Sequence, residues 1–223
     1  IQAKYPTVSA SYEGQNREAF KLINSLSSAG IPILILIYIT IAFTFRSFSQ
    51  PILLFCLMPV SLIGVAWGHW IHGFPVNILS LLGVIALIGI MVNDGLVLIG
   101  KFNNNLKQNF NFNEGLIDAG KSRFRAIFLT TATTVAGLTP LLLEKSRQAQ
   151  WLKPMAISVS YGIAFATILT LILLPIFISL NNDLKVIFKW LVSGNYPDKE
   201  VVERAIIEKK EEQKMDQMNN PEN

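Results

Sequence analysis

The sequence predicts an all-α membrane protein, a bundle of five transmembrane helices, and two observations carry that prediction. Of its 223 residues, 51% are hydrophobic and only 15% are charged, whereas ordinary soluble domains carry about 25% charged residues. Most of the charges gather before residue 29, between residues 101 and 125, and after residue 182. The stretches between them are continuous apolar runs, not the alternating segments of a membrane barrel, so helices are expected.

Each membrane helix needs about 20 mostly apolar residues to cross a hydrocarbon core of roughly 30 Å. Five stretches are expected to do so: Gly30–Phe45, Pro51–Trp70, Val76–Gly100, Ala126–Leu143 and Met155–Leu180. The first is short, but the uncharged residues 23–29 can extend it. Residues 1–28 are then expected to end an external domain, with a last strand that leads into the first helix. Residues 29–181 form the transmembrane domain, and residues 182–223 form a partly disordered cytoplasmic tail.

The orientation follows from the short loops, because lysine and arginine are retained on the cytoplasmic side. An expected loop at 101–125 is rich in them, and the turn at 46–50 carries Arg46, whereas the turn at 69–77 has none. The loop near 144–153 is also basic, so the bias is incomplete. We expect the N-terminus to be periplasmic and the C-terminus cytoplasmic. In the tail, Glu200 and Arg204 at helical spacing predict a short helix.

Several functional classes are disfavoured by the sequence. The net charge of +4 comes from residues that flank apolar segments, so we expect a lipid bilayer and no nucleic acid as partner. Cys56 is the only cysteine, which excludes a disulfide within the chain and a cysteine-based metal site. ATP-binding and hydrolase motifs are absent, so no enzyme activity and no cofactor are expected. The chain begins at Ile1 without a signal peptide, and we expect it to be a fragment.

Asp94 is the only acidic residue expected at membrane depth. A charged side chain near the bilayer centre costs on the order of 2.5–3.5 kcal/mol, so such a carboxyl is a functional candidate by default. Its ability to take up and release a proton suits it to coupling. The alternative is a neutral, hydrogen-bonded aspartic acid that only joins helices, although the neighbouring Asn93 could already do that.

Threonines are the second polar feature of the apolar runs. Thr130 and Thr134 lie four residues apart, so their hydroxyls share one helix face and could pass a proton. Alternatively, each bonds back to its own helix and serves packing. A relay requires Asp94 and Thr130 to be adjacent. Arg123, at the start of the same run, is either a cytoplasmic anchor or an electrostatic partner of the relay.

Small and aromatic residues complete the pattern. Gly64 and Gly68 form a small-xxx-small pair, which is typical of closely packed membrane helices. His69 and His72 lie at a span end beside two tryptophans. No third metal ligand is in sight, so we expect two solvated histidines in an interfacial aromatic belt instead of a metal pair.

Taken in order, several short motifs resemble the C-terminal membrane half of resistance-nodulation-division (RND) efflux permeases of the hydrophobe/amphiphile exporter type. The resemblance covers about residues 30–180, and the motifs are specific in their order and spacing. They are Phe45–Pro51, Met58–Gly64, Gly89–Asp94, Arg123–Thr131, Gly137–Leu141 and Leu174–Phe177.

The resemblance implies one half of a twelve-helix bundle that exports hydrophobic or amphiphilic molecules by proton antiport across the inner membrane. It implies as partners the N-terminal half of the same permease, two further copies in a homotrimer, a periplasmic adaptor and an outer-membrane channel. The implied proton relay comprises Asp94, Asn93, Thr130 and Arg123. Well-studied drug exporters carry lysine and asparagine where this sequence has Asn93 and Asp94, so the relay is expected to be rewired around Asp94.

Two alternatives stay open. The chain could belong to an RND-superfamily protein of the protein-translocation or sterol-sensing kind, in which the same carboxyl is coupled to polypeptide or lipid. It could also be part of a non-transporting assembly subunit, in which Asp94 serves packing alone.

Overall fold

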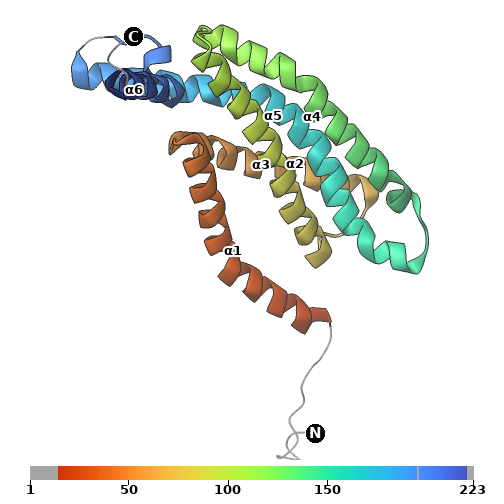
Figure 1. Ribbon diagram of the computed structural model, residues 1–223. Coiled ribbons are helices and arrows are strands. Elements are labelled where there is room, and N and C mark those ends of the chain that lie inside the picture. The colour runs from red at the N-terminus through yellow and green to blue at the C-terminus, as the bar shows by residue number, and fades with distance from the viewer. Residues whose placement is uncertain (1–14, 195, 220–223) are drawn as a thin grey trace, which may run out of the picture. The chain divides into compact units, whose positions relative to one another are not determined.

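The computed structural model describes residues 15–194 and 196–219, and every element within these ranges is a helix. The elements are α1 (Gln15–Phe45), α2 (Ser49–His72), α3 (Ile78–Lys107), α4 (Phe112–Leu143), α5 (Arg147–Ser193), the short 3-10 helix η1 (Glu200–Val202) and α6 (Arg204–Asn219) (Figure 1). The predicted all-α fold is therefore confirmed for the described residues.

The chain divides into two compact units, Ile1–Thr40 and Ile41–Asn223. The described part of the first unit is helical and belongs to α1, which begins at Gln15. The expected domain boundary between residues 28 and 29 thus falls inside a helix. Residues 1–14, where the end of an external domain is expected, lie outside the described residues, so that expectation stays a prediction.

In the described part of the chain, α2, α3, α4 and α5 are each long and apolar enough to cross a membrane. They coincide with four of the five expected spans. The remaining expected span, Gly30–Phe45, is a shorter apolar stretch within α1. At 1.5 Å per residue it is about 24 Å long, somewhat less than a hydrocarbon core of roughly 30 Å.

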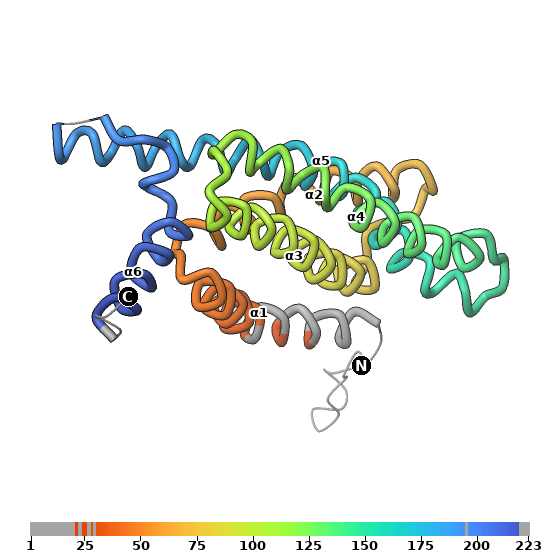
Figure 2. The backbone as a smooth tube through the Cα atoms, turned by 45° about the horizontal axis from the view of Figure 1, so that its top comes forward, coloured from red at the N-terminus to blue at the C-terminus, as the bar shows by residue number. Residues whose placement is uncertain are grey.

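In the second unit, α5 packs against α2, α3 and α4 (Figure 2). The α2–α5 contact is made at the predicted small-residue pair. A Cβ atom built on Gly64 would lie 2.4 Å from the Phe165 side chain, and one on Gly68 would lie 2.6 Å from that of Tyr161. The two helices can therefore pack this closely only because neither glycine carries a side chain.

The prediction of a loop at residues 101–125 is wrong. α3 continues to Lys107 and α4 begins at Phe112, so only four residues connect them. Basic residues mark where a helix leaves the hydrocarbon, whereas the helix itself ends where the backbone turns. Here the turn is made at Asn109, whose φ of 66° lies in the left-handed region that asparagine tolerates.

The polypeptide beyond the last span is also more helical than expected. α5 has 47 residues, about 70 Å at 1.5 Å per residue, so it extends past the expected end at Leu180. The predicted tail helix exists as α6, but its ion pair differs. Arg204 pairs with Glu211 at 3.4 Å, whereas Glu200 lies in η1.

Candidate functional site

α3 is the helix that positions Asp94, and local hydrogen bonds determine where it begins. The Asn77 side-chain oxygen accepts a bond from the Ser80 backbone N–H at 3.0 Å, and the Ser80 hydroxyl oxygen accepts one from the Asn77 N–H at 3.1 Å. This reciprocal arrangement is a capping box, which satisfies N–H groups that a helix start leaves unpaired. The N-cap of α3, Asn77, thus lies 17 residues before Asp94.

Asp94 lies in the buried stripe of α3. The apolar residues Leu87, Met91, Leu98 and Phe102 recur at helical spacing with it, and each is at most 4% exposed. Asp94 itself is 6% exposed. Among the described residues the ion pairs involve other groups, so Asp94 has no basic partner there. A carboxyl in an apolar stripe without a counter-charge among the described residues is a candidate functional group.

Gly95, the residue after Asp94, lies where α3 approaches two other helices. A Cβ atom built on Gly95 would lie 2.3 Å from the Leu54 side chain of α2 and 3.7 Å from that of Leu174 in α5. Similar contacts join Gly83 to Ser158 and Gly162 to Leu87, so α3 and α5 run in the same direction. The absence of a side chain at residue 95 brings three helices together beside the carboxyl.

Of the other predicted relay residues, Asn93 hydrogen-bonds to the Asp94 carboxyl through its side chain, whereas Thr130 and Arg123 lie on α4. Thr130 and Asn93 are exposed in this chain, and the Thr130 hydroxyl donates to the Ala126 carbonyl of its own helix at 3.0 Å. Arg123 is half-buried, and its Nε is enclosed without a hydrogen-bond partner in the described part of the chain. No hydrogen bond of the described residues joins Asp94 to Thr130 or Arg123, so the relay itself stays a prediction.

The depths of the relay residues can be compared because α3 and α4 form an antiparallel hairpin. Lys101 Nζ and Asp118 Oδ2 lie 3.5 Å apart across it. Counting seven residues from each at 1.5 Å per residue places Asp94 level with Arg125. Thr130 lies about 8 Å farther along the hairpin. A direct proton transfer between Asp94 and Thr130 is not available in this arrangement.

The threonine that joins helices is the neighbour of the predicted one. Thr131 is 8% exposed, and its hydroxyl is hydrogen-bonded to that of Thr167 in α5, which is 5% exposed. Thr170, one turn later on α5, is also buried. The α3–α5 contacts above place it within about one helical turn of the depth of Asp94. The sequence contains a signal for the two buried threonines of α5, since Thr167 and Thr170 lie three residues apart in an apolar run.

The expectation of two solvated histidines is wrong for His69. It is 4% exposed, its Nε2 lies 3.0 Å from the hydroxyl of the fully buried Ser158, and its Nδ1 lies 3.0 Å from the Phe74 carbonyl oxygen. His72, which is partly exposed, lies 3.0 Å from the Tyr161 hydroxyl. Both histidines thus bond α2 to α5, because the close approach at Gly68 brings α5 hydroxyls within their reach.

The opposite end of the helices is held by polar contacts. Gln50 of α2 and Asn103 of α3 exchange two amide hydrogen bonds of 2.9 and 3.1 Å. Asn105 donates to the Gly115 carbonyl and to Asp118, both at 2.9 Å. Since these bonds join α2, α3 and α4, this end fixes the hairpin on which Asp94, Arg123 and Thr130 lie.

Comparison with known proteins gives concordant matches. A model of the AcrB/AcrD/AcrF family matches residues 2–181. The swarming motility protein SwrC of Bacillus subtilis is 27% identical over 76% of this chain and 16% of its own length. The cobalt-zinc-cadmium resistance protein CzcA of Cupriavidus metallidurans is 27% identical over 64% of this chain and 14% of its own length. A crystal structure of a heavy metal efflux pump superposes with a TM-score of 0.67 at 25% identity, covering 78% of this chain and 18% of the pump.

These matches agree with the motifs in the sequence and with the observed bundle. The chain spans less than a fifth of the length of these relatives. The family match covers most of the chain, including all of α2, α3 and α4. The chain therefore belongs to the AcrB/AcrD/AcrF family of RND efflux permeases.

Proposed function

We propose that this chain forms part of the membrane domain of a proton-driven exporter, and that Asp94 carries the transported proton. The observation that supports this most is the burial of the Asp94 carboxyl in the apolar stripe of α3, without a basic partner among the described residues. The neutral form fits this apolar surrounding, whereas the charged form requires new hydrogen-bond donors or a cation. Loading and release of the proton therefore favour different packing around residue 94.

The packing around Gly95 offers a way for this change to spread. Because Leu54 of α2 and Leu174 of α5 meet the backbone beside Asp94, a shift of α3 at this point displaces both neighbours. Close-packed interiors transmit such shifts between discrete arrangements and do not absorb them. Protonation at one carboxyl is thereby coupled to the relative positions of three helices.

Asn93, Thr130 and Arg123 are proposed as the remaining members of the relay. Asn93 and Thr130 are exposed in this chain, so they are accessible to the N-terminal half of the same permease. α4 also exposes a large apolar face that includes the stacked rings of Phe124 and Phe128. The proton would pass between Asp94 and Thr130 through groups supplied by that half or through water.

The exported substrate is proposed as a hydrophobic or amphiphilic small molecule, as the sequence resemblance implies. A divalent metal cation is the second candidate, favoured by the names of CzcA and of the heavy metal efflux pump. The described residues contain no group of three or more histidine, cysteine, aspartate or glutamate side chains that could hold a metal ion. In either case this chain supplies energy coupling, and the substrate site is proposed for other parts of the permease.

The proposed setting is the inner membrane, with a periplasmic N-terminus and a cytoplasmic C-terminus. The proposed assembly is a homotrimer with a periplasmic adaptor and an outer-membrane channel. The basic residues around the α3–α4 turn support this orientation, since positive charge is retained on the cytoplasmic side. They include Lys101, Lys107 and Lys121.

Proton flux in proteoliposomes tests the proposal. Full-length wild type is compared with Asp94→Asn and with Asp216→Asn, a matched control in the exposed part of α6. Zn²⁺ and the amphiphilic cation ethidium are the two substrate probes. We expect one probe to stimulate flux in wild type and in Asp216→Asn, and Asp94→Asn to abolish it at equal trimer content. Unchanged flux in Asp94→Asn would refute the role of Asp94 and move the proton site to another part of the permease. Flux that neither probe stimulates in wild type would favour the non-transporting assembly subunit.

A further inference from the structure

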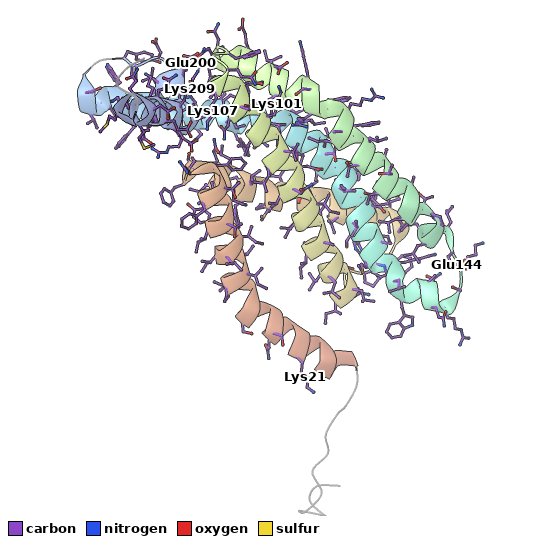
Figure 3. All side chains as sticks on the ribbon, in the orientation of Figure 1. Lys21, Lys101, Lys107, Glu144, Glu200 and Lys209 are labelled. Carbon is purple, nitrogen blue, oxygen red and sulfur yellow. The ribbon has the colours of Figure 1, made fainter. Side chains whose placement is uncertain are left out.

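Residues 196–209, which we name the tail clasp, contact the helix ends around the α3–α4 turn. Three glutamates of the clasp each bind a different part of the bundle. Glu200 binds the start of α4, Glu203 binds α5, and Glu208 binds the end of α3 together with the α1–α2 turn. Figure 3 shows Glu200 and Lys209 of the clasp at the same end of the bundle as Lys107 and Lys101. The first contact is the most informative.

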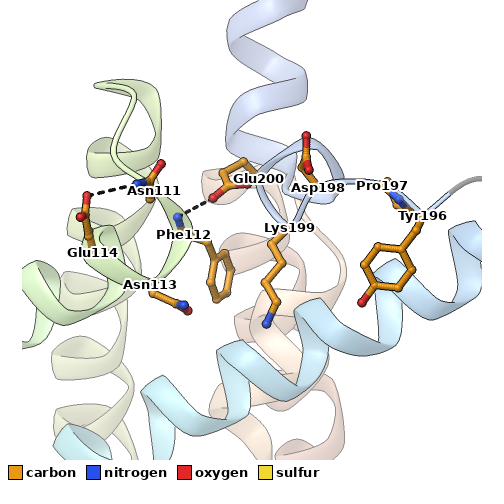
Figure 4. A pocket seen from close by; sticks show the side chains of 9 residues that line it. All are labelled: Asn111, Phe112, Asn113, Glu114, Tyr196, Pro197, Asp198, Lys199 and Glu200. Carbon is orange, nitrogen blue, oxygen red and sulfur yellow. Dashed lines mark hydrogen bonds between the residues drawn. The ribbon is translucent and has the colours of Figure 1, made fainter.

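Glu200 acts as the cap of α4 across 88 residues of sequence. Asn111 occupies the N-cap position, but its side chain makes no capping bond. The Glu200 carboxylate oxygen instead accepts a hydrogen bond of 2.7 Å from the Phe112 backbone N–H (Figure 4). Helix starts leave N–H groups unpaired and carry partial positive charge, so a carboxylate suits this position.

The residues beside Glu200 fix it on α5. Lys199 Nζ lies 2.7 Å from Asp183 and 5.8 Å from the centre of the Phe112 ring. Asn182, which is fully buried, donates bonds of 2.8 Å to the Lys199 carbonyl and to Glu203. Glu203 is only 2% exposed, and both of its oxygens have donors. The buried, charge-assisted bonds of Glu203 hold this segment more firmly than surface ion pairs such as Lys199–Asp183 do.

The far end of the clasp closes the other side of the same turn. Lys209 Nζ donates to the Lys107 carbonyl at 2.6 Å and to the Asn109 side chain at 2.8 Å. Glu208 bridges Lys107 and Arg46 at 2.8 and 3.0 Å. The carbonyls of a helix end lack partners and carry partial negative charge, so a lysine complements them. The clasp therefore supplies an anion to the start of α4 and a cation to the end of α3.

We propose that the tail clasp positions the α3–α4 hairpin, with Glu200 and Lys209 as positioning residues for the proton site. This inference rests on the proposed function, because the hairpin carries Asp94, Arg123 and Thr130. Without the clasp, the first turn of α4 frays and the hairpin can shift relative to α5. Proton binding at Asp94 then occurs in a hairpin that is held only by its other contacts, among them the Gln50–Asn103 amide bonds.

Hydrogen exchange on the full-length protein tests the clasp independently of transport. Loss of a helix cap costs about 1 kcal/mol, so Glu200→Ala is expected to speed exchange of the first α4 amides roughly fivefold. Glu200→Gln keeps an acceptor oxygen and should restore most of the protection. Glu212→Ala, an exposed glutamate of the same tail, is the matched control and should leave exchange unchanged.

Proton flux supplies the second readout. Glu200→Ala and Lys209→Ala should shift the pH profile of flux at unchanged trimer content, whereas Glu212→Ala should not. Exchange at the start of α4 that is equal in Glu200→Ala and Glu212→Ala would overturn the clasp. Faster exchange in Glu200→Ala together with normal flux in Asp94→Asn would support the clasp and refute the proposed proton site, so the two failures can be distinguished.

Discussion

Gly83→Ala and Gly89→Ala place the same methyl group on one helix in two different surroundings. A Cβ atom on Gly83 would lie 2.7 Å from the Met155 carbonyl oxygen and 2.8 Å from the Ser158 Cβ. The first distance is about 0.7 Å short of the 3.4 Å at which ordinary contact begins, and a backbone atom cannot rotate away. At Gly89 nothing lies within 4 Å.

The expected free energies follow from these distances. Overpacking costs roughly 1–3 kcal/mol, and replacing glycine by alanine inside a helix returns about 0.5–1 kcal/mol. Gly83→Ala should therefore lower the free energy of unfolding by up to about 2.5 kcal/mol, with a central value of about 1 kcal/mol. Gly89→Ala should leave it unchanged or raise it by up to about 1 kcal/mol.

Unfolding of the purified protein in mixed detergent micelles, followed by circular dichroism during a titration with dodecyl sulfate, measures both variants. Equal midpoints for Gly83→Ala and Gly89→Ala would refute the close α3–α5 approach on which the position of Asp94 depends. A lower midpoint for Gly89→Ala than for Gly83→Ala would mean that residue 89, and not residue 83, faces α5.

Two further predictions concern α4 and the tail. Thr131→Val breaks the buried bond to α5 and should destabilise the protein by about 0.6–1.7 kcal/mol in the same titration. Thr130→Val loses only a bond within its own helix and should be close to neutral there, so any loss of proton flux in it would come from the relay. Hydrogen bonding and charge from Lys107 hold the pKa of Glu208 below its usual value of 4.5. Wild type should therefore be more stable than Glu208→Gln above about pH 4.5, and the difference should vanish as the pH falls further; a difference that grew on acidification would contradict the pairing.

The sequence predicted the fold because hydrophobic length and charge clustering determine membrane helices almost by themselves. It misplaced the helix ends at 101–125, since charge marks the membrane boundary and not the end of a helix. The turn there depends on Asn109 and on contacts from Lys209, which lies 100 residues away along the chain. Contacts of this kind leave no local signal.

The candidate site was predictable only in part. Asp94 stood out because a lone carboxyl in an apolar run is costly, and the structure buries it. The burial of Thr131 instead of Thr130 depends on the rotation of α4 against α5, which a cluster of adjacent threonines does not specify. Likewise, His69 is buried because α5 approaches α2 at Gly68, a tertiary contact that spacing alone does not reveal.

Infrared difference spectroscopy of the carboxyl groups tests the central claim most directly, because it detects protonation of Asp94 without requiring a known substrate. Full-length wild type, Asp94→Asn and the control Asp216→Asn are compared in lipid while the pH is changed. The account predicts a carboxylic acid band from a dehydrated site that changes with pH in wild type and Asp216→Asn and is missing in Asp94→Asn. A spectrum of Asp94→Asn that retains the same pH-dependent band would contradict the assignment of the proton to Asp94.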